Sequence, residues 1–203
     1  MSELNYSATI TNGAKEAIYF AVKNLKHKGR KKLWIPDVAW IAYSIIAAEL
    51  NIEVALYGAV DEELFSKIDF GNDIVLICTP NNPTGAILDN CSLGLLEKKI
   101  RNGLAVISDE VYSFFESFKN SLLGIVDNKH NLYVVDSFSK CVGCPGLRIG
   151  ILIGPNQDVK EIEKNRSITQ SGINSLGVKV VTSLLAMQHH KKLFHSVSEI
   201  RVF

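Results

Sequence analysis

The sequence has no strong excess of charge of either sign. Its 203 residues include 22 Lys or Arg and 21 Asp or Glu, which gives a formal net charge of +1. Binding to nucleic acid or to an anionic membrane relies on clustered positive charge, so the composition gives no electrostatic argument for either partner. The basic run KHKGRKKL at 26–33 has no aromatic side chains between its charges, and we interpret it as a solvated helix end and loop.

Long apolar segments are also missing. The first ten residues, MSELNYSATI, lack the apolar core of a signal peptide. No uninterrupted apolar run is long enough to span a bilayer. These two features predict a protein that neither enters a membrane nor is exported.

Cysteine is scarce, and its spacing shows no disulfide framework. The four cysteines are Cys78, Cys91, Cys141 and Cys144, a pattern that favours the reducing cytoplasm. Cys141 and Cys144 form a C-x-x-C pair. A structural zinc site would need two more ligands at matching spacing, and Cys78 and Cys91 do not form a second such pair. We therefore expect no metal, with a redox pair as the remaining alternative for the C-x-x-C.

Two kinds of segment alternate along the chain. Continuous apolar runs such as DIVLICTP (73–80) and LAVISDE (104–110) are typical of strands buried on both faces of a sheet. Segments such as AKEAIYFAVKNL (14–25) and SLGLLEKKIRNG (92–103) have apolar residues at helical spacing. The same patterns predict further strands at 32–36, 52–58, 131–140 and 146–155, and further helices at 40–51, 158–166 and 177–200. This alternation predicts an α/β fold of three layers, with a mostly parallel central sheet between helices.

Polar or turn-forming residues follow the predicted strands. TPNNPTG, DEVY and SFSK each come directly after an apolar run, and TNGAKEA opens the first predicted helix. Ligands bind beyond the carboxyl ends of strands in sheets of this kind. Each cluster alone also suits an ordinary role: a plain turn for NNPTG, a helix cap with a packed tyrosine for DEVY, a ligand-free helix start for TNGAKEA and a solvated lysine at 140.

Taken together, the clusters supply an amine, a carboxylate, a phenol, a carboxamide, hydroxyls, an arginine and a helix N-terminus. This set fits an aldehyde cofactor that carries a basic ring nitrogen and a phosphate. A lysine amine can form a Schiff base with the aldehyde, and a carboxylate can keep the ring nitrogen protonated. The phosphate suits a helix N-terminus with arginine and hydroxyl groups around it.

The motifs TPNNPTG, SDEVY and SFSKCVGCPGLRIG, in this order and spacing, resemble those of fold-type I aminotransferases that use pyridoxal 5′-phosphate. Within that family the likeness is to the class I/II group, which includes the aspartate and histidinol-phosphate aminotransferases. The resemblance covers nearly the whole chain. It implies the large domain of that fold, cytoplasmic amino-acid metabolism or biosynthesis, amino-acid and 2-oxo-acid substrates, and a homodimer.

The resemblance also implies a role for each matching residue. Lys140 corresponds to the Schiff-base lysine that moves the substrate proton, and Asp109 to the partner of the ring nitrogen. Tyr112 and Asn82, the asparagine before Pro83, correspond to the residues that hydrogen-bond the phenolic oxygen. The phosphate would be held by Ser137, Ser139, Arg148 and the backbone of Gly13, Ala14 and Lys15. Trp40 is the candidate for stacking on the ring, with a core position as the alternative, and Tyr43 is assigned to packing.

The sequence departs from the family in length. Relative to the family, the chain is expected to be truncated at both ends, with a cofactor-binding large domain at 1–185 and, at 186–203, the start of the helix that leads to a small domain. The family's arginine for the substrate α-carboxylate has no match here. Three functions therefore remain open: an aminotransferase, a cofactor-binding domain or remnant without turnover, and another fold-type I reaction such as decarboxylation or carbon–sulfur lysis.

Overall fold

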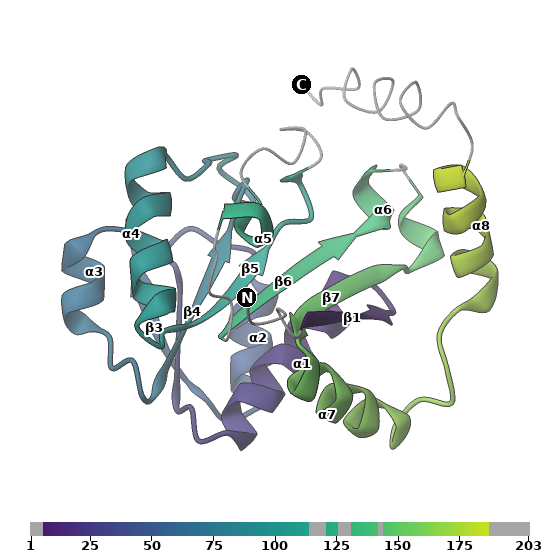
Figure 1. Cartoon of the computed structure of the whole chain (residues 1–203), viewed down its shortest axis with the longest axis horizontal. Coiled ribbons are helices and arrows are strands. Elements are labelled where there is room, and N and C mark those ends of the chain that lie inside the picture. The colour runs from purple at the N-terminus through teal and green to yellow at the C-terminus, as the bar shows by residue number, and fades with distance from the viewer. Residues whose placement is uncertain (1–5, 114–120, 126–130, 142–143, 187–203) are drawn as a thin grey trace, which may run out of the picture.

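A computed structural model describes residues 6–113, 121–125, 131–141 and 144–186. Its core is a sheet of seven strands with helices on both faces (Figure 1), which confirms the predicted α/β fold. The strands are β1 (Tyr6–Thr11), β2 (Lys32–Pro36), β3 (Glu53–Tyr57), β4 (Asp73–Cys78), β5 (Ala105–Asp109), β6 (Leu132–Ser137) and β7 (Gly150–Pro155). The helices are α1 (Ala14–His27), α2 (Ala42–Glu49), α3 (Glu62–Lys67), α4 (Asn90–Arg101), α5 (Leu122–Ile125), α6 (Phe138–Cys141), the 3₁₀ helix η2 (Pro145–Leu147), α7 (Asn156–Ser167) and α8 (Ser175–Ala186).

The strand order is β1-β7-β6-β5-β4-β2-β3. β7 pairs antiparallel with both of its neighbours, and the other pairings are parallel. The carboxyl ends of β1, β4, β5 and β6 therefore meet at one edge of the sheet, and the amino end of β7 lies at that same edge. This arrangement brings the polar clusters that follow those strands to one place.

Two hydrophobic cores hold the layers together. On one face, α1 and α2 pack through side chains such as Ile18, Ala21 and Ile46 against alternate residues of the central strands. On the other face, α3 and α4 pack through side chains such as Leu64 and Leu96. Because β4 is buried along its whole length, its sequence is a continuous apolar run, as expected for a strand covered on both faces.

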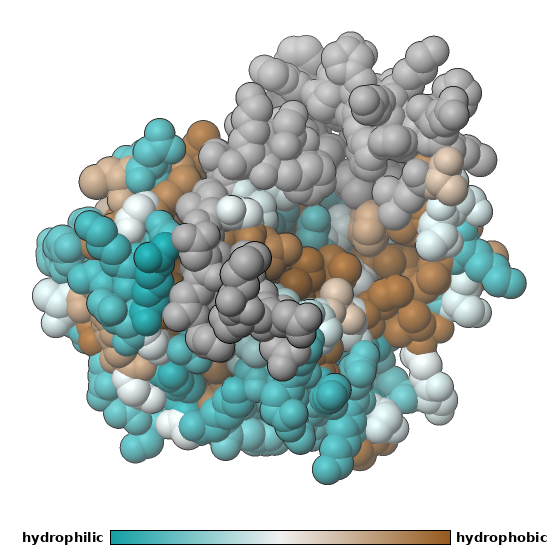
Figure 2. Space-filling model, viewed as in Figure 1, coloured by the Kyte–Doolittle hydropathy of each residue, from teal (hydrophilic) through white to brown (hydrophobic). Residues whose placement is uncertain are grey.

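The hydropathy of the surface differs between the sides of the molecule. In Figure 2, hydrophobic residues gather between the sheet and α8, whereas the side formed by α1 and α7 is mostly hydrophilic. In the described part of the chain no helix is long and apolar enough to cross a membrane.

Several predicted boundaries were wrong. The strand predicted at 131–140 ends at Ser137, where α6 begins, and the strand predicted at 146–155 starts at Gly150, after η2 and a left-handed residue at Arg148. Strand β1 and helix α3 were not predicted. β1 is at the edge of the sheet and only partly buried, so its sequence lacks the continuous apolar run. The predicted helix at 177–200 corresponds to α8 as far as Ala186, and positions 187–203 lie outside the described residues, as does nearly all of the predicted 186–203 segment.

Candidate active site

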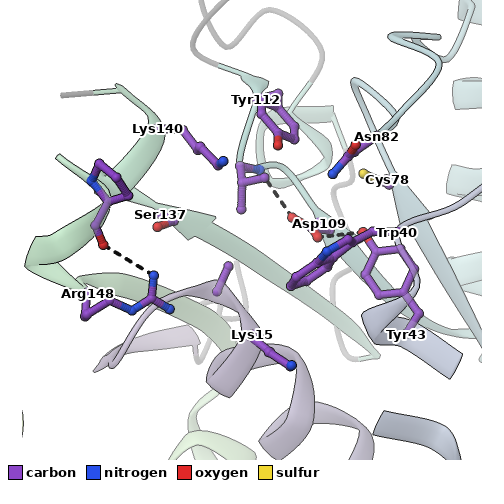
Figure 3. A pocket seen from close by; sticks show the side chains of 13 residues that line it. Lys15, Trp40, Tyr43, Cys78, Asn82, Asp109, Tyr112, Ser137, Lys140 and Arg148 are labelled. Carbon is purple, nitrogen blue, oxygen red and sulfur yellow. Dashed lines mark hydrogen bonds between the residues drawn. The ribbon is translucent and has the colours of Figure 1, made fainter. Parts of the chain in front are cut away.

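One cavity of about 220 Å³ lies at the edge of the sheet where the polar clusters meet. It is lined by every predicted site residue except Gly13 and Ser139, and by four others, Tyr43, Cys78, Val111 and Pro145. The side chain of Ser139 lies outside the described part of the structure. Residues far apart in the sequence thus converge on a single space (Figure 3).

Asp109 is the buried acid of this cavity. It is the last residue of β5 and only 2 % exposed. Its Oδ1 accepts from the backbone N–H of Val111 at 3.3 Å, and its Oδ2 accepts from the hydroxyl of Tyr43 at 2.7 Å. Burial raises the pKa of Asp109 to about 6, although the hydrogen bond from Tyr43 lowers it. Asp109 is therefore an ionised carboxylate at pH 7 and above, held in a fixed direction.

Tyr43 has a role beyond the packing that the sequence analysis assigned to it. It does pack in the core on the face of the sheet that α1 and α2 cover, but its hydroxyl also reaches Asp109 and it lines the cavity. Burial, and then the negative charge of Asp109, raise the pKa of the Tyr43 hydroxyl, which stays a hydrogen-bond donor. The two residues are 66 positions apart, and no local sequence pattern indicates the contact.

Lys140 approaches the cavity from the other side. It lies on α6, directly after β6, rather than on the strand itself. Its Nζ is 5.5 Å from the centre of the Tyr112 ring, and Figure 3 shows the side chain pointing into the cavity. The helical turn of α6 carries the chain across the end of the sheet, so that an amine faces the space above Asp109.

Aromatic and amide groups form another wall. Trp40 is partly buried and packs edge-to-face on Tyr43, with ring centres 5.7 Å apart. It therefore packs on the core and also lines the cavity, and its stacking on a cofactor ring stays a prediction. Asn82, in the loop after β4, lines the same space, as does Cys78. Burial, and then the negative charge of Asp109, raise the pKa of the Cys78 thiol to about 12, so this thiol is neutral.

Arg148 and the start of α1 form the basic end of the cavity. Gly13 adopts a left-handed φ of 90°, and a Cβ at this position would lie 2.5 Å from Nη2 of Arg148. The guanidinium therefore rests against the turn, where Nη2 donates to the Asn12 carbonyl at 3.4 Å. The first N–H groups of a helix have no intrahelical acceptor, and no acceptor is recorded for those of Ala14 and Lys15 in the described chain. These groups together suit an anion.

Ser137 is buried next to this basic end. In the present structure its hydroxyl donates to the carbonyl of Ile149 at 3.2 Å. An anion that took a hydrogen bond from Ser137 would have to replace this carbonyl as the acceptor.

Close packing beneath the turn depends on Gly150, the first residue of β7. A Cβ there would lie 2.5 Å from the carbonyl carbon of Gly13 and 2.8 Å from the nitrogen of Ala14. We expect Gly150→Ala to lower the free energy of unfolding by about 2–3 kcal/mol, because backbone atoms cannot move aside as a side chain can. Urea-induced unfolding measures this change.

The matched control is Gly94→Ala in α4, where an added Cβ meets nothing within 4 Å. Alanine is the better helix former, so this variant is expected to gain about 0.5–1 kcal/mol. Equal stability of Gly150→Ala and the parent chain would contradict the packing argument.

Comparison with known proteins identifies the family to which the chain belongs. The model of the family described as aminotransferase class I and II matches residues 3–201. An aspartate aminotransferase of Thermococcus kodakarensis is 32 % identical over 137 residues, which are 66 % of this chain and 37 % of the relative. A histidinol-phosphate aminotransferase of Pelagibacter ubique is 26 % identical over 202 residues, 95 % of this chain and 54 % of the relative.

The fold is also that of solved aminotransferase structures. An aromatic aminotransferase from Pyrococcus horikoshii superposes with a TM-score of 0.85 at 20 % identity, over 95 % of this chain and 54 % of that one. The chain spans roughly half the length of the relatives that it matches. Since the family model covers nearly every residue, the chain belongs to the class I and II aminotransferase family.

Proposed function

We propose that this chain forms the cofactor-binding part of a pyridoxal 5′-phosphate-dependent aminotransferase, which transfers an amino group between an amino acid and a 2-oxo acid. The observation that carries the proposal is the convergence of Lys140, Asp109 and Arg148 on one cavity from three separate strand ends. Membership of the class I and II family supports the same activity. The proposed large domain comprises residues 1–185.

The residues fit the cofactor at each of its ends. Lys140 would hold the aldehyde carbon, and the buried carboxylate of Asp109 would hold the ring nitrogen. Tyr112 and Asn82 would hydrogen-bond the phenolic oxygen, and Trp40 would cover one face of the ring. The phosphate would take the free N–H groups of Ala14 and Lys15 at the turn of Gly13, with Arg148, Ser137 and Ser139 around it.

The protein's own groups have distinct tasks in this proposal. When bound, the cofactor supplies an electron sink for the charge left after a substrate loses its Cα proton. The Lys140 amine, whose side chain points into the cavity in Figure 3, would be the base that takes that proton and returns it. Asp109 would keep a positive charge on the ring nitrogen, since an ionised buried carboxylate favours a protonated neighbour.

Absorbance spectroscopy on the purified chain tests the proposal. Added pyridoxal 5′-phosphate is expected to give a visible band, and an added amino acid is expected to change the band and release its 2-oxo acid. Release of carbon dioxide or of a thiol instead would identify one of the other fold-type I reactions. A band that no amino acid changes would identify a binding domain without turnover, and the lack of any band would contradict the proposal.

The hydrogen bond from Tyr43 makes a further prediction about pH. Tyr43→Phe removes a donor that lowers the pKa of Asp109, so that pKa is expected to rise above its value of about 6. Below its pKa the carboxyl group is protonated and no longer attracts a protonated ring nitrogen. The pH below which affinity falls should therefore move upward in the variant. Titration with pyridoxine 5′-phosphate, which lacks the aldehyde and so bypasses Lys140, measures this shift.

Tyr19→Phe is the matched control, because Tyr19 packs at the edge of the same core but away from the cavity. The same pH dependence in Tyr43→Phe and in the parent chain would contradict the role given to Tyr43.

We also propose a homodimer. The segment that carries Trp40 and Tyr43 to the cavity exposes three large apolar side chains, Val38, Ile41 and Ile45, which are 48 %, 68 % and 52 % exposed. Burial of such side chains against a second copy would remove apolar area from water beside the cavity.

A further inference from the structure

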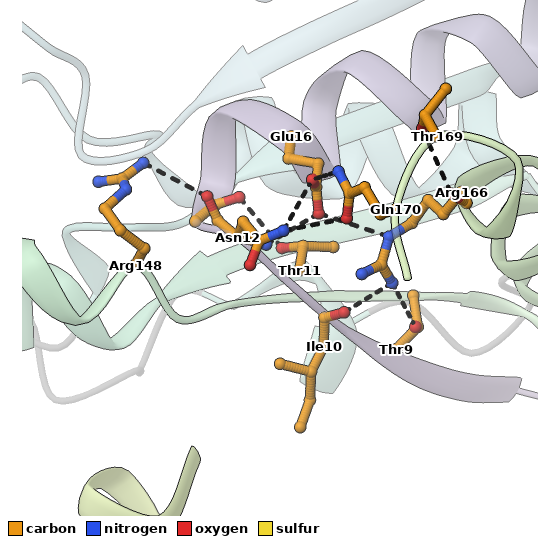
Figure 4. Close-up of polar contacts among 10 residues, drawn as sticks. Thr9, Ile10, Thr11, Asn12, Glu16, Arg148, Arg166, Thr169 and Gln170 are labelled. Atoms are coloured by element: carbon orange, nitrogen blue, oxygen red, sulfur yellow. Dashed lines mark hydrogen bonds and ion pairs between the residues drawn. The ribbon is translucent and has the colours of Figure 1, made fainter. Parts of the chain in front are cut away.

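A polar network lies behind the anion-binding turn, on the side away from the cavity. It consists of Asn12, Glu16, Arg166 and Gln170, and we call it the Glu16 brace (Figure 4). Asn12 precedes the turn, Glu16 is in the first turn of α1, and Arg166 and Gln170 are at the end of α7 and just after it. The brace therefore connects two segments that are distant in the sequence, residues 12–16 and residues 166–170.

The Glu16 carboxylate is the centre of the brace. Its Oε2 accepts from the backbone N–H of Asn12 at 2.8 Å, and its Oε1 accepts from the Asn12 side-chain amide at 3.2 Å. The side-chain amide of Gln170 also donates to Oε1 of Glu16, and its oxygen accepts from Asn12 at 3.0 Å. The backbone N–H and the side-chain amide of Asn12 are thus fixed by Glu16 and Gln170, two residues that do not line the cavity.

Arg166 balances the charge of Glu16. Its side chain is 9 % exposed and that of Glu16 is 13 % exposed, and Nε of Arg166 lies 3.4 Å from Oε2 of Glu16. Nε has no formed hydrogen bond, so the contact is an ion pair. Nη1 of Arg166 donates to the Ile10 carbonyl at 2.7 Å and to the Thr9 hydroxyl at 3.1 Å. The guanidinium is thereby fixed to β1, directly before the turn.

The position of Glu16 in its helix explains what the brace does. Helix α1 begins after Gly13, which has no side chain to cap the helix. Glu16 instead reaches back to the amide of Asn12, one residue before the amide that the glutamate of a capping box contacts. The amides of Ala14 and Lys15 remain available to the cavity, and the amide of Asn12, directly before Gly13, is held in place.

A carboxylate this close to an anion site would by itself repel a phosphate. The buried guanidinium of Arg166 offsets that repulsion, and it is placed where it cannot enter the cavity, because it is hydrogen-bonded to β1. Glu16 can therefore hold the turn without weakening the site electrostatically.

We propose that Glu16, supported by Arg166 and Gln170, is a positioning residue for the cofactor phosphate. It fixes the turn from Asn12 to Lys15 so that the backbone N–H groups and Arg148 face one anion. This inference rests on the proposed function, because the phosphate is that of pyridoxal 5′-phosphate. Glu16 itself does not touch the cofactor.

The test compares the dissociation constants of pyridoxal 5′-phosphate and pyridoxal, which differ only in the phosphate. Their ratio is the phosphate preference, and any difference in aldehyde reactivity is the same for all variants and cancels. Glu16→Ala is expected to lower the phosphate preference about tenfold, as expected for the loss of a hydrogen bond to a charged group. Glu16→Gln should keep most of it, because the amide oxygen still accepts from the backbone of Asn12.

Two further variants complete the design. Glu161→Ala, on the exposed face of α7, is the control and should leave the preference unchanged. Gln170→Ala removes one donor to Glu16 and should lower the phosphate preference about threefold. It keeps the proposal testable if a thermal melt shows that Glu16→Ala is not folded.

The outcomes separate the inference from the proposed function. If the parent chain prefers pyridoxal 5′-phosphate and a folded Glu16→Ala or Gln170→Ala variant has the same phosphate preference, the inference alone is overturned. Equal losses in Glu16→Ala and Glu16→Gln would also overturn it, because the hydrogen bond to the turn would then not be what Glu16 contributes. A parent chain without any phosphate preference would overturn both.

Discussion

Lys140→Ala is expected to remove the visible absorbance band that forms with pyridoxal 5′-phosphate and to reduce amino transfer by about ten-thousandfold or more. The Lys140 amine points into the cavity in Figure 3, and in the proposed mechanism it is both the nucleophile and the base. Loss of both tasks accounts for the size of the effect. The band is measured by absorbance, and turnover by the 2-oxo acid released.

The control is Lys160→Ala, which removes an exposed lysine on α7 outside the cavity. This variant should keep both the band and the turnover. The affinity for pyridoxine 5′-phosphate, which has no aldehyde, should survive in Lys140→Ala, and its loss would indicate that the variant had damaged the fold. A band of normal strength in a folded Lys140→Ala chain would mean that another amine binds the aldehyde.

Asp109→Asn is expected to reduce turnover at pH 8 by about a hundredfold or more, because the carboxamide cannot hold a positive charge on the ring nitrogen. Because Asp109 is buried, water and other charged side chains cannot easily take the place of its carboxylate, and the expected effect is large. Asparagine has the same shape: its carbonyl oxygen can still accept from the Val111 amide, and its NH2 group can donate to the hydroxyl oxygen of Tyr43. The fold should therefore survive. Steady-state kinetics measures the turnover, and circular dichroism measures whether the variant is folded.

The same variant has a distinct pH profile. Burial raises the pKa of Asp109 to about 6, so the carboxylate is charged above that pH and loses its charge below it. Affinity of the parent chain for pyridoxine 5′-phosphate should fall as the pH drops through 6, and Asp109→Asn should lack this part of the fall. The phosphate's own ionisation near pH 6 affects both proteins equally. Identical profiles would show that Asp109 does not face the ring nitrogen.

The site was largely predictable because parallel strands place their carboxyl ends at one edge. The residues after β4, β5 and β6 could be brought together on that argument alone, and Asn82, Asp109 and Lys140 do line one cavity. The local geometry was less predictable. α6 has only four residues, and such a segment has no periodicity that distinguishes it from the end of a strand.

Contacts between distant residues were beyond prediction. The hydrogen bond from Tyr43 to Asp109 and the ion pair between Glu16 and Arg166 each join residues whose neighbours in sequence give no indication of a partner. Tyr43 has the apolar surroundings of an ordinary core residue, and Arg166 is in a helix in which half of the residues are charged. Only the packing of α2 and α7 on the sheet brings these polar atoms within reach of one another.

The antiparallel pairing of β1 with β7 has a consequence for the order in which the molecule can form. β1 is near the beginning of the chain, whereas β7 is near the end of its described part, and the turn that would bind phosphate follows β1 directly. During synthesis on a ribosome, β1 has no strand to pair with until β7 has emerged, and closing so long a loop is slow. The central strands can assemble earlier, so the anion site is expected to be the last part of the described structure to become competent. A nascent chain stalled before Gly150 would then have its central sheet without its phosphate-binding turn.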